Sequence, residues 1–139
     1  MRTRDPKIDM LRSLPALSGY GDRELEQVGA LLDAVEVSPG HVLMKEGGQA
    51  TEVFIIVEGL ATVSVRGQAV AKLGPGEFLG EMALLDLAPR SATVMAETPM
   101  RLLATDPRRF FQLADHPGVA RTIASALAKR LRLAEGALG

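Results

Sequence analysis

Glycine-containing turns interrupt the middle of this chain about every eight to eleven residues. From Ala34 onward, the segments between these turns are short and rich in β-forming residues. The turns are Pro39-Gly40, Gly47-Gly48, Glu58-Gly59, Arg66-Gly67 and Gly74-Pro75-Gly76. Short strands with turns at this spacing are typical of an antiparallel sandwich or roll. We therefore expect a β-roll over residues 34–106.

The expected strands differ in how their apolar residues are spaced. Val53 to Val57 is apolar without interruption, which predicts a strand that is covered on both faces. In residues 61–66, Ala, Val and Val alternate with Thr, Ser and Arg, which predicts one buried and one solvated face. Two further strands are expected at residues 92–96 and 100–104, with Pro99 at the bend between them.

Helical patterns precede the β-rich segment. An apolar stripe with helical spacing, made of Ile8, Leu11 and Leu14, ends at Pro15, which cannot continue a helix. Asp22 is a good N-cap for a second helix. The apolar face of that second helix is expected to contain Leu25, Val28, Leu31 and Leu32.

Helical patterns also follow the β-rich segment. Asp106 and Pro107 indicate a helix start, because aspartate caps the first turn and proline is tolerated within it. Pro117 separates this helix from a last one. The apolar residues of the last helix recur at intervals of four and are Val119, Ile123, Leu127 and Leu131. We expect this helix to pack on its own roll, since it is short for a coiled-coil dimer seam.

The charge and aromatic content limit the partners of the chain. Sixteen Lys and Arg against 17 Asp and Glu give a formal net charge of −1, so nothing attracts the whole chain to DNA, RNA or acidic membranes. One Tyr and four Phe offer few stacking surfaces for single-stranded nucleic acid. Direct DNA binding is therefore not expected.

The chain contains no cysteine, which excludes disulfides and thiolate chemistry. The first residues lack the apolar core of a signal peptide, and the longest strongly apolar run, residues 53–57, is too short to span a bilayer. We expect a cytoplasmic protein with no membrane insertion.

The most informative segment lies within residues 74–94, where an acid and a base flank a short apolar helical turn. Gly80 would let the backbone approach a ligand closely, and the free amide groups at the start of the turn suit an anion. Arg90 can present two parallel donors to phosphate oxygens, and its single charge matches a cyclic phosphodiester. Glu81 accepts hydrogen bonds only, when ionised, and suits a sugar hydroxyl.

The run Gly-Glu-Met-Ala-Leu from residue 80, followed by Arg-Ser-Ala from residue 90, resembles the phosphate-binding cassette of the cyclic nucleotide-binding domain family. Catabolite activator proteins, kinase regulatory subunits and cyclic nucleotide-gated channels share this domain. The likeness covers most of the chain and includes Glu58-Gly59 in a hairpin. It implies an α+β, mainly β fold: an antiparallel β-roll or jelly roll with N-terminal helices, a short phosphate-binding helix and two C-terminal helices.

We expect one domain over residues 1–139, because the chain is too short to divide readily into two domains with a hydrophobic core each. Its parts would be a helical segment at residues 1–33, the β-roll at residues 34–106, and the C-terminal hinge and lid helices at residues 107–139. The cassette would occupy residues 78–94 of the roll.

The resemblance also implies roles for single residues. The family's glutamate that matches Glu81 binds the ribose 2′-hydroxyl, and the arginine that matches Arg90 pairs with the cyclic phosphate. The remaining pocket positions match Gly80, Met82, Ala83, Ser91 and Ala92. Candidates for the base end and the lid are Val63, Val65, Leu73 and Arg130, with ordinary core or surface roles as alternatives. Cyclic AMP is the expected ligand. Cyclic GMP is the alternative, because family members that bind either nucleotide can have a serine at the position that matches Ser91.

Other functions are less compatible with the sequence. A metal-dependent enzyme of the cupin type needs clustered imidazoles, and only His41 and His116 occur, far apart. We therefore expect no catalysis, metal or cofactor. Because this sequence ends soon after the last amphipathic helix, we expect no recognition helix of the catabolite activator type in it. A degenerate roll that serves only as a protein interaction module is the alternative function, although the intact Gly80, Glu81 and Arg90 argue against it. For Glu81 and Arg90 themselves, the alternative role is a structural ion pair.

The two C-terminal helices are the expected signalling element. Pro117 would form a hinge with two positions, and a ligand would bind with different affinity to each of them. Phe110 and Phe111 would anchor this hinge. The output would pass to an effector protein or to an attached domain, since the sequence fits both a stand-alone sensor and part of a larger protein.

Overall fold

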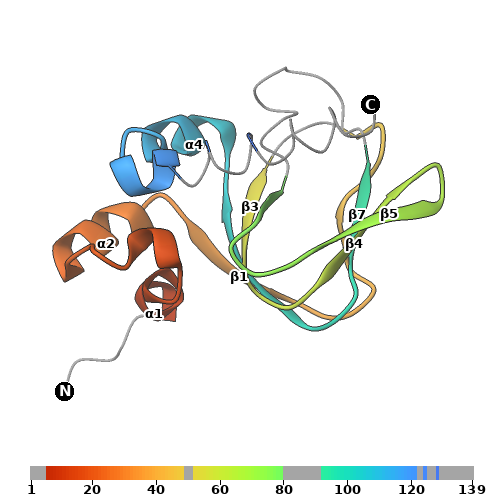
Figure 1. Cartoon of the computed structure of the whole chain (residues 1–139), viewed down its shortest axis with the longest axis horizontal. Helices are drawn as coiled ribbons and strands as arrows, with labels where there is room; N and C mark the ends of the chain where they lie inside the picture. The colour runs from red at the N-terminus through yellow and green to blue at the C-terminus, as the bar shows by residue number, and fades with distance from the viewer. Residues whose placement is uncertain (1–5, 49–51, 80–91, 122–123, 125–127, 129–139) are drawn as a thin grey trace.

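The computed structural model describes residues 6–48, 52–79, 92–121, 124 and 128. Within them, the strands form two four-stranded antiparallel sheets that make a roll (Figure 1). The first sheet has the order β1 (Asp33–Val37), β8 (Met100–Thr105), β3 (Val53–Glu58), β6 (Phe78–Leu79). The second has the order β2 (Val42–Met44), β7 (Thr93–Ala96), β4 (Ala61–Val65), β5 (Gln68–Leu73). The predicted antiparallel, mainly β fold is confirmed.

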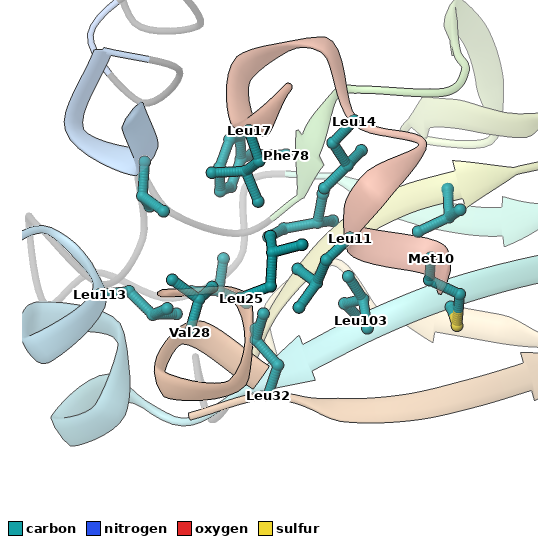
Figure 2. Packing of buried hydrophobic residues seen from close by; sticks show 14 of the residues in the cluster. Met10, Leu11, Leu14, Leu17, Leu25, Val28, Leu32, Phe78, Leu103 and Leu113 are labelled. Atoms are coloured by element: carbon teal, nitrogen blue, oxygen red, sulfur yellow. The ribbon is translucent and has the colours of Figure 1, made fainter. Parts of the chain in front are cut away.

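Helices from both ends of the chain lie on one side of the roll (Figure 1). They are α1 (Pro6–Arg12), the 3-10 turn η1 (Pro15–Leu17), α2 (Asp22–Gly29) and α4 (Pro107–Leu113), and residues 117–121 are again helical. Their apolar side chains pack against the first sheet in what we call the helix-side core (Figure 2). This core consists of Met10, Leu11, Leu14, Leu17, Leu25, Val28, Leu32, Val53, Ile55, Val57, Phe78, Leu103, Phe110, Leu113 and Val119.

Strand β3 separates this core from a second one. Val53, Ile55 and Val57 face the helices, whereas Phe54 and Ile56 face the other sheet. The second, intersheet core consists of Phe54, Ile56, Ala61, Leu79, Val94, Ala96, Met100, Leu102 and Ala104. Every side chain from Val53 to Val57 is at most 8% exposed. The prediction that the uninterrupted apolar run is a strand covered on both faces is confirmed.

The predicted N-cap residue is confirmed for α4 near the C-terminus but not for α2 near the N-terminus. Asp106 caps α4 by accepting a hydrogen bond from the Arg109 amide at 2.8 Å, and Pro107 is the first helical residue, as predicted. The prediction that Asp22 caps α2 is wrong by one residue. Gly21 occupies the cap without a side-chain bond, and the Asp22 carboxylate pairs instead with Arg12 of α1.

The predicted apolar face of the second helix is only partly helical. Leu25, Val28 and Leu32 are buried as expected. However, α2 ends at Gly29, so Leu31 lies in the connector to β1 and is half-buried.

The predicted hairpin at Glu58-Gly59 is wrong, because β3 and β4 belong to different sheets. Gly59 has φ +98°, and a Cβ there would collide with the Pro99 carbonyl and with Met100. The expected strands on either side of Pro99, β7 and β8, also belong to different sheets. Both bends therefore carry the chain from one sheet to the other, and glycine is needed where the two bends meet.

The alternation predicted for residues 61–66 is not reflected in exposure. Ala61 is buried, but Thr62, Val63, Ser64 and Val65 are all half-buried. On the outer face the Thr62 hydroxyl bonds the Glu97 carboxylate, which also pairs with Lys72 at 3.1 Å. These neighbouring side chains contact Thr62, and the two faces of β4 differ less in exposure than the sequence predicts.

Candidate functional site

The predicted ligand-binding segment connects the two sheets. Residues 80–91 follow β6 of the first sheet and precede β7 of the second. The predicted ligand residues Gly80, Glu81, Met82, Ala83, Arg90 and Ser91 lie outside the described residues. Ala92 is described: it is half-buried and lies in a bend directly before β7.

The strand that leads into this segment is anchored on both cores. Phe78 pairs with Ile55 and packs in the helix-side core, while Leu79 pairs with Phe54 and packs in the intersheet core. The preceding turn is bonded to the same strand, because the Gly76 amide donates to the Ile56 carbonyl at 2.8 Å. Gly76 has φ +87°, a conformation that favours glycine. Residue 80 therefore follows a strand whose position is fixed by β3.

The strand that leaves the segment is equally well held. Thr93 and Val94 of β7 pair with Ser64 and Val63 of β4. The Thr93 hydroxyl accepts a hydrogen bond from the Glu46 amide at 3.0 Å. This places the end of the predicted cassette beside β4, in the interior of the second sheet.

The turn between β4 and β5 is tied to the same corner. Its two residues, Arg66 and Gly67, have φ of 53° and 80°, as expected for a two-residue hairpin turn with both positions left-handed. The Arg66 amide donates to the Glu46 carboxylate at 3.1 Å. Glu46 therefore links this turn to Thr93 at the start of β7.

The predicted base-end residues lie on the inner side of the second sheet. Val63 and Leu73 are half-buried and pack against the intersheet core. Val65 is two residues beyond Val63 on the same strand and therefore lies on the same face. The structure thus brings Val63 and Val65 close to the strand that leaves the cassette. The predicted lid residue Arg130 lies outside the described residues.

The predicted hinge anchors are not equivalent. Phe110 is buried in the helix-side core, but Phe111 is 54% exposed. Their rings meet edge to face with centroids 5.8 Å apart. Only Phe110 has the burial expected of an anchor, because consecutive positions of a helix point in different directions. The other predicted members of the last helix, Ile123, Leu127 and Leu131, lie outside the described residues.

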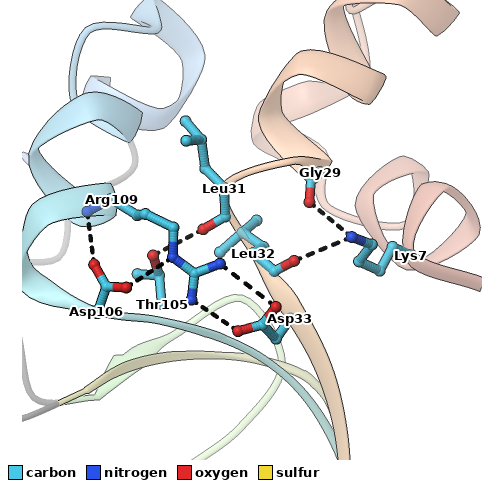
Figure 3. Close-up of polar contacts among 8 residues, drawn as sticks. All are labelled: Lys7, Gly29, Leu31, Leu32, Asp33, Thr105, Asp106 and Arg109. Atoms are coloured by element: carbon cyan, nitrogen blue, oxygen red, sulfur yellow. Dashed lines mark hydrogen bonds and ion pairs between the residues drawn. The ribbon is translucent and has the colours of Figure 1, made fainter.

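Sequence reasoning missed a polar cluster at the base of α4 (Figure 3). The Arg109 guanidinium contacts both carboxylate oxygens of Asp33, at 2.7 and 3.4 Å, and its Nε donates to Asp106 at 2.9 Å. The hydrogen bond from Arg109 lowers the pKa of Asp33, and the Arg109 amide lowers the pKa of Asp106. In turn, Asp33 raises the pKa of Arg109. The sequence separation of 76 residues between Asp33 and Arg109 gives no local signal for this pair.

A cavity of about 660 Å³ lies on the helix side, away from the predicted base-end residues. The residues that line it include Ile55, Phe78, Tyr20 and Arg121. The Tyr20 hydroxyl accepts a hydrogen bond from the Gly118 amide at 2.8 Å. This bond joins the N-terminal helices to the helical residues from 117 to 121.

The described residues contain no cluster of three His, Asp or Glu side chains that could hold a metal ion. His41 is exposed and His116 is half-buried. No helix in the described part of the chain is long and apolar enough to span a bilayer.

Comparison with known families agrees with this arrangement. The family model of the cyclic nucleotide-binding domain matches residues 34–116, which run from β1 past α4 and include the cassette. The chain belongs to the cyclic nucleotide-binding domain family.

Similar proteins carry this domain as one part of a longer chain. The Pycsar effector protein XpPycTIR of Xanthomonas perforans is 35% identical over 76% of this chain and 36% of its own length. A cyclic nucleotide-gated potassium channel of Mesorhizobium japonicum is 36% identical over 75% of this chain and 29% of its own. A cAMP-binding acyltransferase from Mycobacterium smegmatis has a similar structure, with a TM-score of 0.80 and 28% identity over 91% of this chain and 41% of that one. The chain thus spans about a third of the length of the curated relatives that it matches.

Proposed function

We propose that this chain binds cyclic AMP and acts as a sensor domain rather than as an enzyme. The observation that supports this proposal is the motif at residues 80–92 of the cassette, which follows β6 and precedes β7. Arg90 would neutralise the cyclic phosphate with two parallel donors, and Glu81 would accept a hydrogen bond from the ribose 2′-hydroxyl. Gly80, Met82, Ala83, Ser91 and Ala92 would complete the pocket.

The base of the nucleotide would lie toward the inner side of the second sheet. Val63 and Val65 present apolar surface there, beside the start of β7. Leu73 packs against the same core from β5. Apolar walls with a few polar groups at one end are the usual composition of small-ligand sites.

A thermal-shift series with cyclic AMP, cyclic GMP and 5′-AMP tests the proposal. Cyclic AMP at about 100 times its dissociation constant should stabilise the fold by about 2.7 kcal/mol. The shift with 5′-AMP should be much smaller, because an open dianion brings a charge that one arginine does not compensate. A larger shift with cyclic GMP would reassign the ligand. No shift with either cyclic nucleotide would favour the protein interaction module.

We further propose that binding is transmitted through the C-terminal helices to an output domain or a separate effector. The support is that the relatives are channels, effectors and an acyltransferase in which this domain is a minor part of the chain. Hydrogen exchange should then slow in residues 107–135 when nucleotide is added. Protection confined to residues 78–94 would mean that no signal leaves the pocket.

A further inference from the structure

Three elements bond to the short connector between α2 and β1 or to Asp33, the first residue of β1 (Figure 3). The Lys7 ammonium of α1 donates to the Leu32 carbonyl at 3.2 Å, and the Thr105 hydroxyl at the end of β8 donates to the Leu31 carbonyl at 2.8 Å. Arg109 of α4 bonds the side chain of Asp33, the next residue. The connector is therefore the place where the N-terminal helices, the roll and α4 meet.

Among these contacts, the Asp33–Arg109 pair is the one that fixes the position of α4 by charge. The guanidinium is held from both sides, by Asp33 of β1 and by the cap residue Asp106 of its own helix. The arginine side chain is only 28% exposed. Ion pairs at a surface contribute most when an arginine is held at two points within a network, as it is here.

The pair restricts how α4 can move. Arg109 lies in the first turns of the helix, and Asp33 starts β1, which is paired with β8 along its whole length. If α4 shifts relative to the roll, the pair must break or its geometry must change. The strength of the ion pair therefore differs between two positions of α4, and the pair favours the position in which it is stronger.

We propose that the Asp33–Arg109 pair is a coupling contact: by favouring one position of α4, it sets the affinity of the cyclic nucleotide site. This inference rests on the proposed function, because it requires that nucleotide binding and the position of α4 are linked. The two residues act as positioning residues, since the predicted nucleotide contacts lie in the cassette and not in α4.

The test measures cyclic AMP affinity by calorimetry for Asp33→Asn, Arg109→Gln and the double variant. Each single variant should change the dissociation constant about threefold or more, the size expected when a coupling residue outside the site is altered. Both should shift it in the same direction, and the double variant should match the single ones rather than add. Arg109→Lys keeps the charge without the two-pronged contact, so it should lie between wild type and Arg109→Gln.

Glu36→Gln is the matched control. Glu36 is also an exposed carboxylate on β1, and it also pairs with an arginine, Arg101, at 3.8 Å. However, Arg101 lies on β8, so that pair stays within the roll. Glu36→Gln should leave the affinity within about twofold of wild type. Without nucleotide, Asp33→Asn should speed exchange in residues 107–113, and Glu36→Gln should not.

Each outcome decides one question. If wild type binds cyclic AMP and both Asp33→Asn and Arg109→Gln bind as tightly as Glu36→Gln, the coupling contact is refuted while the proposed function stands. Opposite shifts in the two single variants would also refute it. If the folded wild type binds neither cyclic AMP nor cyclic GMP, the proposed function is refuted, and this inference with it.

Discussion

The two sides of β3 are built in different ways. The intersheet core consists of strand residues between Phe54 and Ala104, and backbone ladders tie the strands that carry it. The helix-side core joins residues from Met10 to Val119, and its helices contribute no backbone ladder to either sheet. On that side, the described polar attachments include Asp33–Arg109 and the Tyr20–Gly118 bond.

From this difference we expect the sheets to act as a scaffold and the helices to rearrange more easily. Strand ladders must break together, whereas a helix held by apolar contacts and a few polar bonds can shift alone. The cassette is attached to the scaffold through β6 and β7, yet Phe78 of β6 reaches the helix-side core. If the roll holds a ligand as proposed, Phe78 would connect the ligand-binding segment to the helix-side core.

The largest expected effect compares two fully buried leucines, one from each core. Leu102 is 0% exposed between the sheets, and Leu113 is 1% exposed under the helices. Leu102→Ala should lower the global free energy of unfolding by about 3–5 kcal/mol, because the packed sheets collapse little around the cavity. Leu113→Ala should lower it less and should mainly speed exchange in residues 107–121. Equal losses in urea unfolding, with exchange raised everywhere, would show that the two sides form one cooperative unit.

The next largest effect concerns the ligand on the scaffold side. Arg90→Ala should weaken cyclic AMP binding by about 2–5 kcal/mol, since the phosphate would lose its only arginine partner in the cassette. Arg90→Lys should recover only part of this loss. Glu81→Gln should cost less, and a 2′-deoxy analogue should lose affinity for wild type but little more for Glu81→Gln. Calorimetry with both ligands provides the comparison. Equal binding of the 2′-deoxy analogue and cyclic AMP by wild type would exclude Glu81 as the ribose contact.

Sequence patterns predicted features that depend on nearby residues. The Asp106 cap and the double burial of Val53 to Val57 both follow from side chains a few positions apart. The cassette motif is also a local pattern, within residues 80–92, and the roles of Glu81 and Arg90 stay predictions.

Features that depend on distant partners escaped prediction. Whether Gly59 makes a hairpin or a crossing between sheets depends on Pro99, which lies opposite it in space. The Tyr20–Gly118 bond joins residues 98 positions apart, and Asp33–Arg109 joins residues 76 apart. Asp22 is not the cap of α2, because Gly21 takes that position and the Asp22 carboxylate pairs with Arg12 of α1.

A smaller effect is expected where the N-terminal helices hold the C-terminal ones. Tyr20→Phe removes the acceptor of the Gly118 amide and keeps the ring. It should cost about 0.5–1.5 kcal/mol of stability, the usual net value of one hydrogen bond. Exchange should become faster at residues 117–121, while the amides of β3 and β8 keep their wild-type rates. Faster exchange in those strands as well would mean that the helical side cannot open separately.

The smallest effect is the acid sensitivity of the α4 attachment. The pKa values of Asp33 and Asp106 are lowered in the folded state, chiefly by hydrogen bonds from Arg109, from an ordinary value of 3.8. Folding therefore gains from both carboxylates above that value, and the gain is lost as the pH falls through their lower folded-state pKa values. Lys7 strengthens the effect on Asp33 and the two carboxylates oppose each other, while Arg109 stays charged throughout.

Urea unfolding of wild type, Arg109→Gln and Arg101→Gln from about pH 7 to pH 3 isolates this contribution from that of the other carboxylates. The stability difference between wild type and Arg109→Gln should shrink as the pH falls below about 4, because protonated Asp33 and Asp106 gain little from the arginine. Arg101 pairs with Glu36 at 3.8 Å and with Glu58 at 3.5 Å on the roll, both longer than the 2.7 Å contact between Arg109 and Asp33, so Arg101→Gln should show a weaker pH dependence. A constant difference for Arg109→Gln across this range would mean that the arginine supports α4 by packing and not by charge. In that case apolar burial alone, and not the charge of Arg109, would attach α4 to the roll on the side of the helix-side core.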